Sequence, residues 1–141
     1  MKWIKEKIKQ GIELHEIVVL SREVSDLKPF SRALKENNIS CWELDASSNF
    51  LYNEVGLATV ARVKGLEYRC VAIVNCNEDQ FPSEKELEKI GDISDEDSFL
   101  IKEINLLYVA MTRARDNLYI SYTGSSSMYL DNIEDYSKND I

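Results

Sequence analysis

A chain of 141 residues, 44% of them hydrophobic, is long enough to form one domain around its own core. The three cysteines form no C-x-x-C pair and only one histidine is present, so we expect reduced thiols and no metal site. No run of 18 apolar residues and no apolar signal core occur, which favours a cytoplasmic protein without a membrane partner.

The net charge of −8 is unevenly distributed. Residues 78–97 contain nine acidic residues and two lysines, and the tail from Asp131 contains four acidic residues and one lysine. The rest of the chain is therefore slightly positive. We expect the acidic segment to be a solvated loop, and the total charge does not exclude a nucleic-acid partner.

The N-terminal third alternates between helical and strand patterns. Apolar residues at helical spacing predict an amphipathic helix over 2–12, and the apolar run 16–21 predicts a buried strand. A second helix is expected over 26–37. Short apolar segments then predict strands over 39–44 and 55–61.

The C-terminal half continues the alternation. A strand is expected over 70–75, and a capping box of Ser94 and Asp97 predicts the start of a long helix that ends within 113–116. Its apolar stripe comprises Leu100, Ile104, Leu107, Tyr108 and Met111, of which Leu100, Ile104, Leu107 and Met111 are assigned to the core. A fifth strand is expected over 117–122, and residues 124–141 are expected to be a weakly ordered tail.

Together these patterns predict one α/β domain over 1–141, with three layers and a mainly parallel sheet. The runs IVVL and VAIV are apolar at every position, as is typical of parallel strands covered on both faces. Ligands of such sheets bind beyond the carboxyl ends of strands. Arg22 and the loop from Lys64 to Glu67 both follow predicted strands. Arg113 would join them only if the long helix points back to the same edge.

Several cations and one acid in this part of the chain are candidates for binding chemistry. Each arginine taken alone is more often part of a structural ion pair, but planar guanidinium groups also clamp phosphate oxygens. Gly65 would let the backbone approach a ligand. Glu67 would either accept a hydrogen bond from a ribose hydroxyl or pair with Arg62 or Arg69.

The chain contains no G-x-x-x-x-G-K-[ST] phosphate loop, no G-x-G-x-x-G motif and no Ser/His/Asp set beyond its single histidine. A hydrolase that is complete in this chain is therefore not expected. Arginines that touch phosphate would instead complete a site on another domain.

Two longer segments carry a resemblance to a known family. The stretches LATVARVKGLEYRCVAIVNCNEDQFP and INLLYVAMTRARDNLYIS resemble motifs V and VI of superfamily 1 helicases of the UvrD/Rep/PcrA type. The segment EIVVLSREVSDLKPFSRALKENNISCWEL is similar to motif IV and the helix after it. The three matches keep the family order and cover roughly residues 16–123.

The resemblance implies a RecA-like second motor domain, which binds ATP together with an N-terminal RecA-like domain that carries the phosphate loop and holds Mg²⁺. By motif position, it implies that Arg22 and Arg113 are arginine fingers. It also implies that Glu67 binds ribose and that Lys64 and Gly65 line the cleft. The isolated chain is expected to be inactive as an ATP hydrolase.

The resemblance further implies single-stranded DNA as a partner and stepwise movement along it, with Thr59 in the segment that contacts the DNA backbone. The family histidine two positions after Thr59 is replaced by Ala61, and Arg62 is the neighbouring candidate for a nucleic-acid contact. RNA is not excluded. The alternative function is a free-standing RecA-like module that regulates or binds a protein partner without motor activity.

Overall fold

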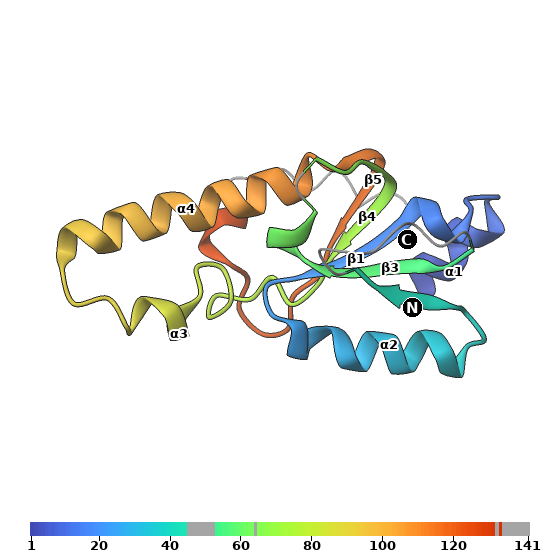
Figure 1. Ribbon diagram of the computed structural model, residues 1–141, viewed down its shortest axis with the longest axis horizontal. Coiled ribbons are helices and arrows are strands. Elements are labelled where there is room, and N and C mark those ends of the chain that lie inside the picture. The colour runs from blue at the N-terminus through green and yellow to red at the C-terminus, as the bar shows by residue number, and fades with distance from the viewer. Residues whose placement is uncertain (45–52, 64, 132, 134–141) are drawn as a thin grey trace.

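The computed structural model describes residues 1–44, 53–63, 65–131 and 133. Five parallel strands form a sheet in the order β2-β3-β1-β4-β5 (Figure 1). The strands are β1 (Ile17–Ser21), β2 (Cys41–Glu43), β3 (Val55–Thr59), β4 (Tyr68–Ile73) and β5 (Ala114–Ile120). The α/β class, the parallel sheet and the approximate positions of the five strands are therefore confirmed.

Helices lie before β1 and in the connections β1–β2, β3–β4 and β4–β5. The α-helices are α1 (Lys2–Lys9), α2 (Leu27–Glu36), α3 (Glu84–Leu87) and α4 (Ile93–Met111). Short 3₁₀ helices are η1 (Leu14–Glu16), η2 (Val24–Asp26), η3 (Val60–Arg62) and η4 (Met128–Leu130). In the described ranges, no helix is long and apolar enough to cross a membrane.

Both faces of the sheet are covered. Successive residues of a strand point to opposite sides, so β1, β3 and β4 each contribute to two core clusters. In β1, Ile17 and Val19 belong to the cluster formed with α1 and α2, while Val18 and Leu20 belong to the cluster formed with α4 and η3. All five residues of β1 are buried. This confirms the three-layer arrangement predicted from the continuously apolar runs.

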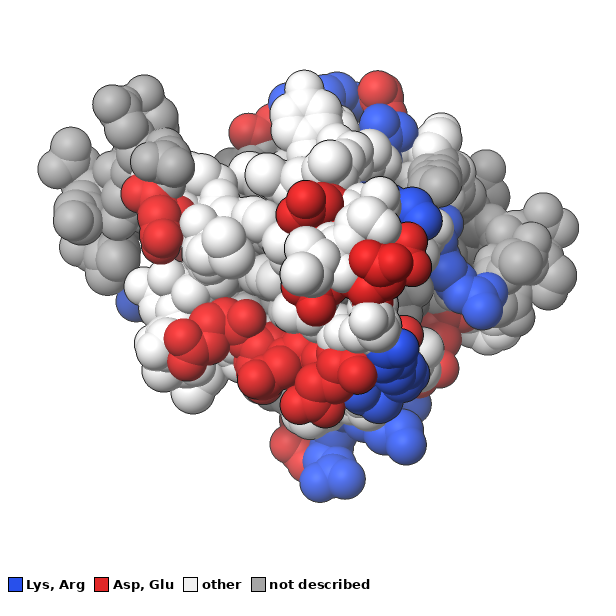
Figure 2. Space-filling model, turned by 90° about the vertical axis from the view of Figure 1, so that its left-hand side faces the viewer, with Lys and Arg blue, Asp and Glu red and all other residues white. Residues whose placement is uncertain are grey.

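Part of the acidic segment is built into the domain, so the expectation of a solvated loop was wrong for that part. Phe81 is fully buried in the core cluster on the α4 side, and its peptide bond to Pro82 is cis. Ser83 is buried and caps α3 by accepting a hydrogen bond from the Glu86 N–H. The acidic side chains of α3 and the start of α4 gather at the end of the molecule shown in Figure 2.

Helix α4 differs from the prediction at both ends and in its orientation. The carboxylate of Asp92 caps it by accepting from the Ser94 N–H, so the predicted Ser94 capping box is wrong. The helix also ends before the predicted range. Leu107 is buried as expected, but Ile104 is 45% and Tyr108 65% exposed. The N-terminal part of α4 extends beyond the sheet (Figure 1).

The chain after Gly124 is held against the domain as far as it is described continuously. The Ser127 N–H donates to the Cys76 carbonyl at 2.9 Å, and Ser127 is buried. The Tyr129 hydroxyl donates to the Leu100 carbonyl at 3.1 Å. The remainder of the predicted tail, residues 134–141, lies outside the described residues.

Candidate functional site

Arg113 and Glu67 lie together at the amino edge of the sheet. Glu67 directly precedes β4, and Arg113 directly precedes β5. These two strands pair so that Tyr68 lies beside Ala114. The Arg113 carbonyl accepts from the Tyr68 N–H at 2.9 Å, and its guanidinium donates to the carbonyls of Val109 (3.1 Å) and Leu66 (3.4 Å). These two bonds use two of the five guanidinium N–H donors. The half-buried Arg113 side chain is thus held in place by backbone, while three donors take no part in these bonds.

The loop before β4 supplies the other two residues expected to bind a nucleotide. Gly65 adopts φ +79°, a left-handed conformation that glycine adopts without strain. Gly65 and Glu67 are both exposed. Lys64 lies outside the described residues. The loop therefore presents an accessible backbone and a carboxylate beside Arg113.

A small open pocket at the same edge is lined by residues of η1, β4 and β5 together with Glu67. Its volume is about 150 Å³, and its lining comprises His15, Glu16, Glu67, Tyr68, Arg69 and Arg115. Pockets that enclose a whole small ligand typically measure about 300–1,000 Å³. The pocket is therefore large enough for only part of a nucleotide.

The charges around this pocket are largely balanced. Arg69, one of the two arginines offered by the sequence as a partner of Glu67, pairs instead with Asp116 at 2.7 Å and with Glu16 at 3.5 Å. Arg115 also pairs with Asp116 at 3.1 Å. Hydrogen bonds from Arg115 and Arg69 lower the pKa of Asp116. Burial raises the pKa of Tyr68 to about 12, so its hydroxyl stays protonated at neutral pH.

Arg22 lies at the opposite edge of the sheet. It follows Ser21 at the carboxyl end of β1, whereas Arg113 precedes the amino end of β5. Because β1, β4 and β5 are parallel, the length of β4 separates the two arginines, a distance on the order of 20 Å. The long helix ends at the amino edge and does not point back. The structure therefore does not bring Arg22 and Arg113 to one point.

Thr59 and Arg62 lie at the same edge as Arg22. Thr59 ends β3 and is paired in register with Ser21, the residue before Arg22. Thr59 is half-buried, and Arg62, at the end of η3, is exposed. The sequence candidates thus divide into an amino-edge group around Arg113 and a carboxyl-edge group around Arg22.

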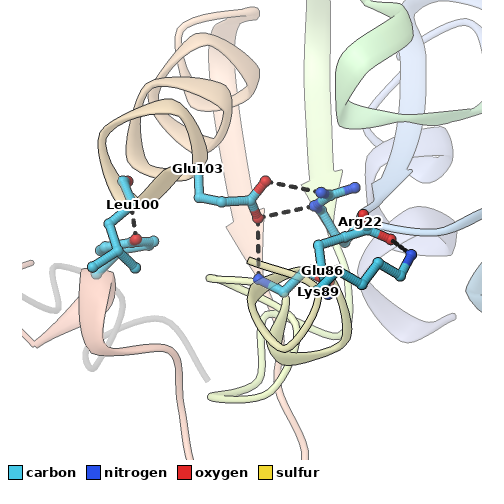
Figure 3. Close-up of polar contacts among 7 residues, drawn as sticks. Arg22, Glu86, Lys89, Leu100 and Glu103 are labelled. Atoms are coloured by element: carbon cyan, nitrogen blue, oxygen red, sulfur yellow. Dashed lines mark hydrogen bonds and ion pairs between the residues drawn. The ribbon is translucent and has the colours of Figure 1, made fainter. Parts of the chain in front are cut away.

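Glu103 was missed by the sequence analysis. Glu103 is only 3% exposed, and its carboxylate forms a bidentate pair with Arg22 at 3.0 and 2.8 Å (Figure 3). The signal in the sequence was a helical stripe of Glu103, Leu107 and Ala110, all buried, shifted by one position from the stripe that we assigned to the core. An acid in a buried stripe requires a partner, because buried charges are costly when unpaired. The described residues contain no cluster of three or more metal-binding side chains.

The comparisons with known proteins agree with the motifs. The model of the UvrD-like helicase C-terminal domain matches residues 42–125. DNA helicase II of Escherichia coli is 33% identical over 122 residues, which cover 82% of this chain and 16% of the relative. The putative ATP-dependent DNA helicase YjcD of Bacillus subtilis is 41% identical over 69 residues, or 48% of this chain and 9% of the relative.

A solved structure shows the same fold. The crystal structure of the C-terminal domain of a possible DNA helicase from Lactobacillus plantarum WCFS1 superposes with a TM-score of 0.65 at 20% identity, covering 94% of this chain and 70% of that chain. The chain itself spans only about 16% of the length of its relative from Escherichia coli. With a family match over more than half of its residues, the chain belongs to the UvrD-like helicase C-terminal domain family.

Proposed function

We propose that this chain acts as the C-terminal motor domain of an ATP-dependent DNA helicase or translocase. ATP would be held, with Mg²⁺, by an N-terminal RecA-like domain of the same protein. The observation that carries the proposal is the amino-edge group, in which Arg113 of one motif lies beside Gly65 and Glu67 of another. The names of the related helicases support it.

The amino-edge residues have distinct roles in this proposal. Arg113 stabilises the negative charge that develops on the transferred phosphoryl group, the role of an arginine finger. Hydrogen bonds to two carbonyls fix the Arg113 guanidinium before the nucleotide binds. Little further ordering of this side chain is then needed on binding. Glu67 accepts a hydrogen bond from a ribose hydroxyl, while Lys64 and Gly65 line the cleft. The pocket is small because the other domain supplies the rest of the site.

Arg22 is the less suitable of the two predicted fingers. It lies about 20 Å from Arg113 along the strands, and two of its N–H donors are bonded to Glu103. We therefore assign Arg22 to the carboxyl edge with Thr59 and Arg62, where single-stranded DNA, or RNA, would be bound. Closing and reopening of the cleft at the amino edge would then move the strand held at the carboxyl edge.

The test is the DNA-stimulated ATPase activity of the protein that contains this chain together with its N-terminal motor domain. Arg113→Ala should lower turnover by about 10³- to 10⁵-fold, the range for arginine fingers. Arg32→Ala is the matched control, because Arg32 is an exposed arginine on α2, which belongs to the other face of the sheet. Unchanged turnover in Arg113→Ala would remove Arg113 from the site. Wild-type protein that neither hydrolyses ATP nor responds to DNA would favour the free-standing module.

A further inference from the structure

The Glu103 carboxylate joins three segments that are distant in the sequence. One oxygen accepts from Arg22 Nη2 at 2.8 Å. The other accepts from Arg22 Nε at 3.0 Å and from the Ser83 N–H at 3.1 Å. These bonds connect α4 with the end of β1 and with the turn that follows the cis Phe81–Pro82 bond (Figure 3). Both oxygens of the buried acid are therefore satisfied.

The pair fixes Arg22 without using all of its hydrogen-bonding capacity. A guanidinium has five N–H donors in a rigid plane, and Glu103 takes two of them along one side of that plane. The Arg22 side chain is still 20% exposed, whereas that of Glu103 is 4% exposed. A buried acid thus orients a cation whose other donors are directed away from it.

The position of the pair connects it with the carboxyl-edge group. Arg22 directly follows Ser21, the residue in register with Thr59, so Arg22 lies just beyond the carboxyl end of the strand next to that threonine. A phosphate oxygen would accept hydrogen bonds from the N–H groups that Glu103 leaves unused. The same helix that carries Glu103 continues for two more turns and ends beside Arg113.

We propose that Glu103 is a positioning residue that holds the Arg22 guanidinium at the carboxyl edge for contact with a phosphate of single-stranded nucleic acid. This inference rests on the proposed function, in which that edge binds the strand. It adds Glu103 to the site and predicts that removing this acidic group weakens nucleic-acid binding. Removing a negative charge near DNA should by itself tighten binding. Loss of positioning should weaken it.

The experiment is binding of a fluorescent deoxythymidine oligonucleotide to the full-length protein, measured by anisotropy across a range of salt concentrations. We expect Glu103→Gln to weaken binding about tenfold, because a hydrogen bond between charged groups is lost. Arg22→Gln should also weaken binding and should lower the slope of log K against log salt by about 0.7, the value for one single-strand phosphate contact. Since the two residues act together, the double variant should bind no more weakly than Arg22→Gln alone.

The matched control is Glu88→Gln, which removes the same charge from an exposed acid just after α3. Its binding should be unchanged or slightly tighter. Binding by Glu103→Gln that equals or exceeds that of the wild type would overturn the inference, and so would additive effects in the double variant. Should Glu103→Gln fail to fold, Glu103→Asp keeps the charge but shortens the arm, and unchanged binding by that variant would also overturn it. A wild-type protein that does not bind the oligonucleotide would instead overturn the proposed function.

Discussion

The buried Phe81 provides a direct test of how the acidic segment is anchored. Its side chain is fully buried in the cluster that includes Leu107 and Ala110, and its carbonyl accepts a hydrogen bond from the Ser127 hydroxyl. Burying a phenylalanine contributes about 1.5–3 kcal/mol. The cavity left by Phe81→Ala adds to this loss, so we expect the free energy of unfolding to fall by about 3–5 kcal/mol. For a domain of this size, each kcal/mol corresponds to roughly 3–4 °C.

The assay is thermal and urea denaturation of the chain, with Phe81→Ala compared with Phe99→Ala. Phe99 is a matched control because it lies only eighteen positions later, on the projecting part of α4, and is half-buried. The midpoint should fall by roughly 10 °C or more for Phe81→Ala and clearly less for Phe99→Ala. A loss below about 1 kcal/mol at Phe81, or equal losses at both positions, would refute the view that Phe81 anchors this segment.

Two further predictions concern α4 and the core next to β4. Leu107→Ala should cost about 2–5 kcal/mol in urea denaturation, while Ile104→Ala should cost less than about 1 kcal/mol, and equal costs would contradict the observed orientation of the helix. Burial raises the pKa of Cys76 and that of Tyr68 to about 12. The native state therefore keeps these protons after the unfolded chain loses them, so the contribution of these two groups to stability should be constant below about pH 8 and fall as pH rises from there. Cys76→Ala should make the free energy of unfolding less dependent on pH between about pH 8 and 10, and an unchanged dependence would count against the raised pKa.

The fold was predictable because its central strands, β1, β3 and β4, are covered on both faces. A run such as IVVL has no polar position, and a strand without a solvent-facing side must be buried between two layers. The direction of the stripe on α4 was not predictable in the same way. Ile104 and Glu103 compete for the buried face, and local periodicity favours the isoleucine. The ion pair of Glu103 with Arg22, which is 81 positions away, places Glu103 on the buried face.

The grouping of the site residues was only partly predictable. The motifs identified Arg22, Glu67 and Arg113 as candidates, but the two edges of the sheet could not be separated from the sequence. Glu67 follows one strand and precedes the next, and the sequence analysis grouped it with the carboxyl edge of β3. The structure places it at the amino edge, because the connection between the strands crosses the whole length of the sheet. The order of residues along the chain does not show at which edge of the sheet a connection between strands ends.

That crossing segment is fixed to the core of the domain. Between Thr59 and Tyr68 the chain passes over β1 and descends the length of β4, a path of about 22 Å from the strand rise and spacing. Three residues of the connection are wound into η3, and the Leu66 N–H donates to the Val63 carbonyl at 3.2 Å, so the connection is not an extended chain. Val60 and Val63 fasten it to the core beneath α4. In the proposed function, this connection would link the Gly65 and Glu67 loop at one edge of the sheet with Thr59 at the other.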